Sequence, residues 1–289
     1  MRKILPGLLS ATLLLLASGA LRGEEAGEGY VLAKKDAPMP IGAKFTEETS
    51  FDMKSGKVVL STEGEEDMEG TMKITGVESI TTEALSPTRY RRIQTKNEET
   101  STMAIAGETV EEPAVLGPLT GVPVILEEKD GKYSATLEAG VPTPEQEKEL
   151  AEIAGEFAQR EDLVTYGEVA RKPGDKWKVD PKLLAEFAGA KDLDGSLTVE
   201  FVEIKEVGGI RCAVLKSVLD FTGTMADDDL ENATMRVQGE YTALRSLVDL
   251  MDLETKLEAN FTIKGESDGT SILTDGPMSA RVRNTLTKP

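Results

Sequence analysis

The chain is rich in carboxylate side chains and contains no histidine, with 52 Asp and Glu residues against 33 Lys and Arg. Without histidine, no Ser-His-Asp or Cys-His relay can form, and neither can a histidine-ligated zinc, copper or haem site. The chemistry that remains is carboxylate-pair glycoside hydrolysis, a serine-lysine nucleophile, or a metal held by oxygen ligands alone.

None of these remaining mechanisms has a specific signal. Carboxylate pairs are too numerous to be diagnostic, and glycosidases usually present aromatic platforms to sugars, whereas Phe, Trp and Tyr make up only 4% of this chain. No Gly-x-Ser-x-Gly or Ser-x-x-Lys motif sits at a strand-to-helix turn. We therefore predict no catalytic residue, no cofactor and no enzyme activity, and rank a carboxylate-based hydrolase third among the functions.

Two acidic clusters have the ligand type that calcium prefers. The segment Asp192-Leu193-Asp194-Gly195 mimics the middle of a calcium loop, but Ala190 occupies the first ligand position and Phe201 the closing one, so the match fails. The run at 227–229, followed by Glu231 and Asn232, is more typical of a solvated loop tip. We predict no metal site.

The densest basic stretch surrounds Tyr90. On a strand, Arg89 and Arg91 would share one face, while Arg92 would point the other way with Tyr90. Pairing with carboxylates across neighbouring strands is the favoured interpretation, and a partner-binding patch is the alternative.

Two single-copy residues are interpreted as core. Cys212 alternates with Ile210 and Val214, which predicts a buried thiol rather than a reactive or intermolecular one. Trp177, the one tryptophan, is expected to anchor the start of the second half of the chain against a sheet, with the wall of a ligand cavity as the alternative.

The first 20 residues have the pattern of a secretory signal peptide. Arg2 and Lys3 supply the positive start, residues 8–16 form an apolar run too short to span a bilayer, and Ser18 and Ala20 precede the expected cut. No cysteine in this region could carry a lipid. We predict a periplasmic or secreted protein with no transmembrane segment in the mature chain. The alternative is an uncleaved anchor.

The net charge of −19 becomes more negative once Arg2 and Lys3 are removed. Such a surface repels phosphate backbones and anionic headgroups, so we expect no nucleic-acid partner.

Tight-turn signals separate short strand-like runs along most of the chain. Asp130-Gly131, Gly208-Gly209 and Asp268-Gly269 each lie between alternating apolar stretches, which predicts two-residue hairpins. Ser55-Gly56 is a fourth, weaker turn signal. The runs between these turns predict antiparallel strands with one buried face.

Two helices are predicted in mid-chain. Thr143, Pro144 and Gln146 form a capping-box pattern, followed by Leu150, Ile153, Ala154, Phe157 and Ala158 at helical spacing. The second helix is expected from Pro181 to about residue 188, with Asp180 as its cap. Residues 242–252 fit either a helix or a strand.

The two halves of the chain resemble one another. Residues 89–104 match 211–226 at several positions, and the Gly-x-Lys-aromatic segment 42–45 matches 174–177. We predict a mainly β (α+β) fold: a curved antiparallel sheet or half-barrel built from two similar β-meander halves, with two mid-chain helices. A pair of sandwich domains is the competing architecture. The expected divisions are a signal peptide at 1–20, a first meander half at 21–142, a helical connector at 143–190 and a second meander half at 191–289.

A signal peptide, a Gly-Asp-Lys-Trp turn at 174–177 before a helix, and meandering strands on both sides resemble a broad group of uncharacterised secreted bacterial proteins. The layout is also similar to the periplasmic half-barrel carriers of lipoproteins and lipids, which implies a curved sheet wrapped around helices. The chain departs from the lipid-anchored members because it has no lipid-attachment cysteine, and no functional residue carries over from the resemblance.

These observations favour an exported, non-enzymatic binding or carrier protein for an apolar or amphipathic ligand. The alternative is a structural or protein-interaction component of the periplasm or envelope, whose partner would be an envelope protein. A carrier would leave an apolar cavity on its curved sheet, whereas an interaction protein would fill that face and expose a patch elsewhere.

Overall fold

A computed structural model describes residues 29–289 except 36–38, 113, 115, 158–159, 186 and 226–229. The predicted signal peptide and the acidic run at 227–229 therefore lie outside the described residues. The strands are β1 (Tyr30–Val31), β2 (Lys44–Thr62), β3 (Met68–Ser86), β4 (Arg89–Ile105), β5 (Glu108–Glu112), β6 (Val124–Lys129), β7 (Lys132–Leu137), β8 (Ala170–Arg171), β9 (Lys176–Val179), β10 (Ala190–Val207), β11 (Ile210–Met225), β12 (Glu231–Ser246), β13 (Asp252–Ser267) and β14 (Thr270–Thr287). The helices are α1 (Pro144–Phe157), α2 (Glu161–Tyr166) and the 3-10 helix η1 (Pro181–Leu184).

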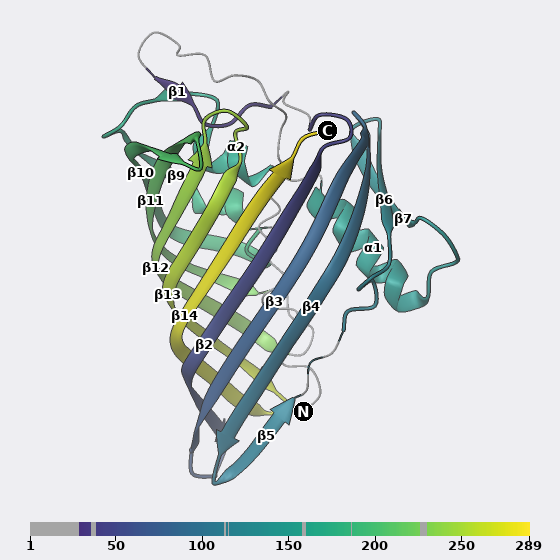
Figure 1. Cartoon of the computed structure of the whole chain (residues 1–289). Helices are drawn as coiled ribbons and strands as arrows, with labels where there is room; N and C mark the ends of the chain where they lie inside the picture. Colours follow the sequence, from purple (N-terminus) through teal and green to yellow (C-terminus); the bar gives the residue numbers. More distant parts are fainter. Residues whose placement is uncertain are drawn as a thin grey trace.

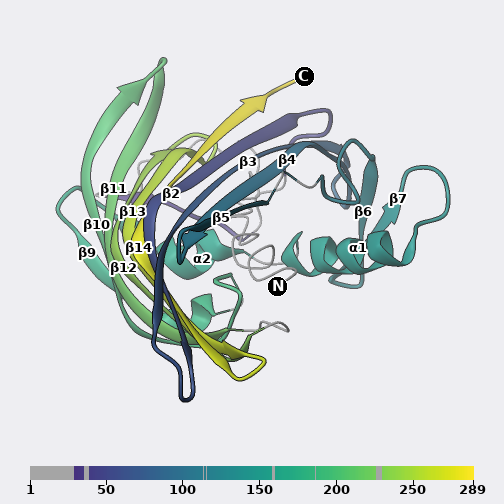
Figure 2. The same cartoon turned by 90° about the horizontal axis from the view of Figure 1, so that it is seen from below.

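Most of the described strands form one antiparallel sheet of 12 strands, in the order β7-β6-β4-β3-β2-β14-β13-β12-β11-β10-β9, with β5 paired to β4. The first long strand, β2, lies beside the last, β14, so the sheet is continuous from one half of the chain to the other. Figures 1 and 2 show that the long strands curve and that α1 and α2 lie on the concave side. The predicted mainly β fold with a curved antiparallel sheet is confirmed. The similarity of the two halves stays a prediction: 89–104 and 211–225 both lie in hairpin strands, but equivalence requires their superposition.

Turn chemistry explains where the strands reverse. Asp130 and Gly131 have φ values of 54° and 75°, Asp268 and Gly269 have 51° and 75°, and Gly208-Gly209 is positive at both residues. Positive φ at both central residues gives the turn that matches the twist of the flanking strands. These three hairpins are confirmed.

The fourth turn signal, Ser55-Gly56, does not form a hairpin, so this prediction is wrong. Strand β2 continues through Ser55 and Gly56, and its register with β3 shifts between Met53 and Gly56. An added Cβ at Gly56 would collide with the Met53 sulfur, so glycine here permits a bulge instead of a reversal.

Helix α1 begins where the capping box predicts. The amide of Gln146 donates to the Thr143 hydroxyl at 3.3 Å, and the amide of Thr143 donates to Gln146 Oε1 at 3.1 Å. Leu150, Ile153 and Phe157 are buried, so the apolar stripe packs inward as expected.

The second predicted helix needs correction, and the structure decides between the two alternatives for residues 242–252. The second predicted helix shortens to the four-residue η1, although Asp180 does cap it by accepting from the amide of Lys182. Residues 242–252 contain the end of β12, a turn and the start of β13, because strand pairing on both sides overrides the helical spacing. Helix α2 was not predicted; its N-cap, Arg160, makes no side-chain capping bond, so no local signal marks it.

Two apolar clusters occupy the buried side of the sheet. The main cluster joins buried residues of β2, β3 and β10–β14 with Tyr166 of α2 and Leu184 of η1. The second cluster packs Leu150, Ile153 and Phe157 of α1 against residues that include Leu126 of β6. Both clusters include fully buried side chains, and each such Leu or Phe contributes roughly 1.5–3 kcal/mol relative to exposure.

Candidate functional site

Methionine is concentrated on the concave face of the sheet. Of the ten methionines in the chain, six belong to the main cluster or pack against it, and each comes from a different strand. They are Met53 of β2, Met72 of β3, Met103 of β4, Met225 of β11, Met235 of β12 and Met278 of β14. We call this set the methionine face. Because methionine is unbranched and polarizable, such a surface can repack around apolar molecules of different shapes.

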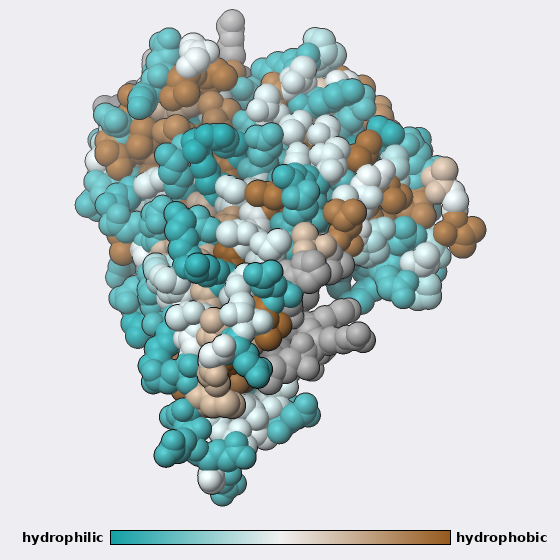
Figure 3. Space-filling model, turned by 60° about the horizontal axis from the view of Figure 1, so that its bottom comes forward, coloured by the Kyte–Doolittle hydropathy of each residue, from teal (hydrophilic) through white to brown (hydrophobic). Residues whose placement is uncertain are grey.

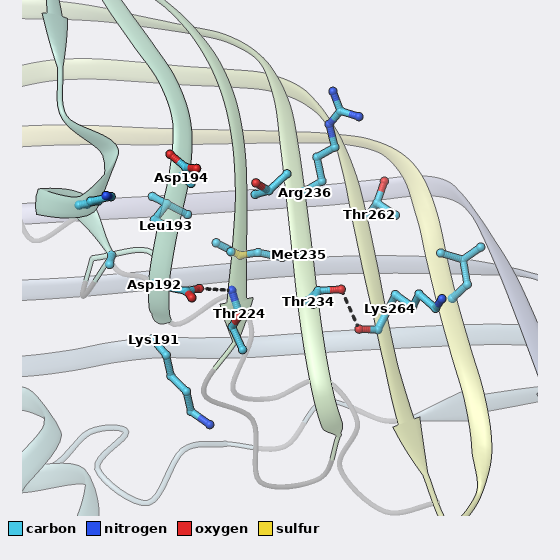
Figure 4. A pocket seen from close by; sticks show the side chains of 15 residues that line it. Lys191, Asp192, Leu193, Asp194, Thr224, Thr234, Met235, Arg236, Thr262 and Lys264 are labelled. Carbon is cyan, nitrogen blue, oxygen red and sulfur yellow. Dashed lines mark hydrogen bonds between the residues drawn. The ribbon is translucent and has the colours of Figure 1, made fainter.

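A cavity of about 920 Å³ reaches the methionine face near the ends of β10–β13 (Figure 4). Leu193 and Met235 line it and also belong to the main apolar cluster. The other lining residues are mostly polar or charged, and Figure 4 shows the Asp192 carboxylate accepting a hydrogen bond from the Thr224 amide, 2.6 Å away. The cavity therefore connects a polar rim with the apolar interior.

A second feature, the polar belt, separates the two apolar clusters. Its centre is Arg245, whose side chain is fully buried. Its guanidinium lies 2.9 Å from the Asp162 carboxylate and 3.3 Å from that of Asp252. It also donates to the Leu32 carbonyl and lies 4.5 Å from the ring centroid of Tyr166. Helix α2 is thus held to β12 and β13 by buried, charge-assisted hydrogen bonds.

The polar belt continues across β14, β2, β3 and β4 and faces α1 and α2. Asn284 donates to the Asp252 carbonyl at 2.8 Å. Residues of the four strands lie side by side in the sheet register, in the order Asn284, Glu47, Ile80 and Gln94. The belt consists of Glu47, Glu78, Arg92, Gln94, Glu149, Glu156, Arg160, Glu161, Asp162, Arg245, Asp252 and Asn284.

The carboxyl groups of the belt are strongly perturbed. Burial raises the pKa of Glu47 to about 8; the Glu78 carboxylate adds to the rise, and the Arg92 guanidinium opposes it. Burial likewise raises the pKa of Glu161 to about 8 and that of Glu156 to about 7. Taking an ionised carboxylate out of water is unfavourable unless it is paired, so these groups favour their neutral forms.

Several buried polar atoms of the belt have no hydrogen-bond partner among the described residues. They are both carboxylate oxygens of Glu47, one oxygen each of Glu149, Glu161, Asp252 and Asn284, and the Nη1 atoms of Arg92 and Arg245. Buried polar atoms are nearly always hydrogen-bonded in proteins, so the belt has unused binding capacity, mostly for donors.

The residues singled out from the sequence have structural roles. The Arg89–Arg92 alternation is confirmed: Arg89 is exposed, Arg91 pairs with Glu138 at 3.0 Å, and Arg92 is buried with Tyr90. Asp194 accepts a bond from the adjacent Gly195 amide within strand β10, which is not a calcium loop.

Cys212 is buried and free, as predicted. Trp177 packs against the main cluster and donates from Nε1 to the Thr165 carbonyl at 2.8 Å, which fits the anchoring role; it is not among the cavity-lining residues. Within the described part of the chain, no group of three or more Cys, Asp or Glu side chains is arranged to hold a metal ion.

Sequence reasoning missed both the methionine face and the polar belt. The belt did leave one signal, since Glu47 falls in phase with Phe45, Phe51 and Met53, the inward positions of β2. A carboxylate at an inward position of a strand indicates that an ionisable group is buried in the core.

Comparison with known proteins assigns no family. No protein-family model and no curated protein matches the chain. A lipovitellin structure, titled for its lipid-protein interactions, aligns with a TM-score of 0.40 at 9% identity, covering 86% of this chain and 25% of that chain. The chain thus spans about a quarter of that lipovitellin.

Two bacterial structures align more weakly over most of their length. A LolA superfamily protein from Nitrosomonas europaea has a TM-score of 0.16 at 7% identity, covering 87% of this chain and 88% of that chain. An outer membrane channel from Pseudomonas putida F1 has a TM-score of 0.25 at 8% identity, covering 88% and 99%. The weak resemblance to periplasmic half-barrel carriers that the sequence predicted is confirmed, and it remains weak. Among the described residues, no helix is long and apolar enough to cross a membrane.

Proposed function

We propose that this chain is an exported, non-enzymatic binding or carrier protein whose concave face takes an apolar or amphipathic ligand. The observation that carries the proposal is the methionine face, in which six strands each contribute one methionine to a single apolar cluster. A purely structural core would be served as well by residues with fewer rotamers, such as leucine and valine.

The cavity supports the same proposal by giving a ligand access to the interior. Its volume of about 920 Å³ lies within the usual range for small-molecule sites. By contrast, the exposed large apolar residues include Val110, Val141, Val169, Leu183 and Val218, which come from separate strands and loops and from η1. The visible surface in Figure 3 is mainly hydrophilic, with apolar side chains in separate patches.

Native mass spectrometry with organic extraction tests the proposal on protein purified from its own cell envelope. A co-purifying lipid or other apolar molecule supports carriage. A protein that carries nothing and binds no alkyl-chain probe contradicts it and favours the interaction component instead. The same preparation tests export, since we expect a mature N-terminus near Leu21 or Glu24.

Methyl NMR of [13C]methionine-labelled protein locates the binding face. We expect an alkyl-chain probe to shift the methyl signals of the methionine face. Met39 and Met251, which belong to the second cluster, and exposed Met68 serve as internal controls and should not move. Shifts confined to these controls would place the ligand elsewhere.

A further inference from the structure

The polar belt buries more carboxyl groups than cationic groups. Its seven carboxyl groups face three guanidinium groups, those of Arg92, Arg160 and Arg245. A buried charge without a partner is strongly unfavourable, so the belt must either take up protons or bind a cation.

Glu47 shows where a cation would bind. Its side chain is 2% exposed, and neither carboxylate oxygen has a hydrogen-bond partner among the described residues. The charges that act on it belong to Glu78 of β3, Arg92 of β4, Glu156 of α1 and Glu161 of α2, so its carboxyl group points into the belt.

The unpartnered atoms of the belt are mostly acceptors. Oxygens of Glu47, Glu149, Glu161, Asp252 and Asn284 lack a donor, whereas the unpartnered donors of the belt are Nη1 of Arg92 and Nη1 of Arg245. An ammonium group brings three N–H donors and one positive charge. It would therefore supply the missing hydrogen bonds and a cation with which an ionised carboxylate can pair.

We propose that the polar belt binds the ammonium head of an amphipathic primary amine whose alkyl chain lies on the methionine face. This inference rests on the proposed binding function and names the chemical class of its ligand.

The inward-facing side chains of β2 form a row that joins the polar belt to the methionine face. Glu47, Thr49, Phe51 and Met53 occupy successive inward positions, so this row changes from acidic to polar to apolar. It is about 20 Å long at roughly 3.3 Å per residue. Beside Phe51, Gly76 of β3 leaves room for the ring, because a Cβ there would collide with it.

The decisive experiment compares three probes with the same alkyl chain: dodecylamine, dodecanoate and dodecanol, each below its micelle concentration. Binding to the full mature protein is measured by calorimetry near neutral pH. We expect the amine to bind at least about ten-fold more tightly than the alcohol, and the acid to bind weakest.

Two variants separate the head-group site from the rest of the protein. Glu47→Gln keeps the shape but removes the carboxyl group that would ionise to pair with the ammonium, and should lower the affinity for the amine by about ten-fold while leaving the affinity for the alcohol unchanged. Glu258→Gln, at an exposed position of β13, should change neither. Thermal unfolding of both variants confirms that they fold.

The outcomes distinguish this inference from the function on which it rests. Equal affinity for the three probes overturns the ammonium site and leaves the binding function standing. No binding by any probe overturns both. Competition by calcium alone, in place of the amine, would assign the belt to a metal ion and also overturn the inference.

Discussion

Arg245 of β12 and Asp162 of α2 form an ion pair with a distance of 2.9 Å, and their side chains are only 0% and 3% exposed. The pair lies between the two apolar clusters and fixes the short helix to the sheet. Arg245→Met would leave Asp252 buried without the cation that pairs with it, and would leave Asp162 paired with Arg160 but not with the sheet. We expect the free energy of unfolding to fall by roughly 3–5 kcal/mol.

Urea denaturation measures this change. Arg236→Met is the matched control, because Arg236 pairs with Asp220 at 3.1 Å on the exposed surface. An exposed pair contributes only about 0–1 kcal/mol, so the control should be nearly neutral. Equal effects of the two variants would show that the buried pair does not hold the helix.

The carboxyls of the polar belt predict that stability falls as pH rises. Glu47, Glu156 and Glu161 have an ordinary pKa of 4.5 and folded values of about 8, 7 and 8. The folded protein therefore retains protons that the unfolded chain releases between about pH 4.5 and 8. The stability contributed by these neutral groups is complete below about pH 4.5 and is lost as pH passes through their folded pKa values.

We expect the free energy of unfolding to be higher near pH 5.5 than near pH 8.5, by at least about 1 kcal/mol, since one pKa unit corresponds to about 1.4 kcal/mol. Glu47→Gln should reduce this slope and stabilise the protein at the higher pH. The groups that face Glu47 are Glu78, Arg92, Glu161 and Glu156, so a residual slope should remain in the variant. A stability that rises with pH over this range would contradict the prediction.

Features that depend only on residues close together in the sequence could be predicted. Asp130-Gly131 and Asp268-Gly269 determine a turn through their own φ preferences, and Thr143 and Gln146 satisfy each other within one helical turn. These features could be predicted without knowing the fold.

The polar belt depends on contacts that sequence spacing does not reveal. Arg245 and Asp162 are 83 residues apart, and their pairing depends on how α2 lies against the sheet. Gly56 illustrates the same limit: the residue type indicates special backbone geometry, but only the pairing of β2 with β3 decides between a bulge and a turn.

The reciprocal bonds between Thr143 and Gln146 predict a measurable contribution of the cap to α1. Thr143→Ala removes the hydroxyl that accepts from the Gln146 amide, and should lower the free energy of unfolding by about 1 kcal/mol. Hydrogen exchange should quicken in the first turn of α1. Lys148→Ala, an exposed substitution in the same helix, is the control and should leave that turn protected. Unchanged exchange in the cap variant would show that packing alone holds the helix end.

Cys212 provides a probe of strand β11. Its side chain is 0% exposed, and its thiol lies 3.5 Å from the Ile210 carbonyl. Burial raises the pKa of this thiol, and the nearby Asp249 and Asp252 carboxylates raise it further. Since the thiolate is the reactive form, both enclosure and raised pKa slow its reaction.

We therefore expect native protein to react with a disulfide reagent such as DTNB at least about 100-fold more slowly than urea-unfolded protein, the rate being limited by local opening of β11 and β12. A Ser134→Cys variant supplies an exposed thiol on β7 in the same protein and should react at the rate of an unfolded cysteine. If Cys212 in the native protein reacted as fast as this control, the thiol would be accessible and the interpretation of Cys212 as a core residue would fail.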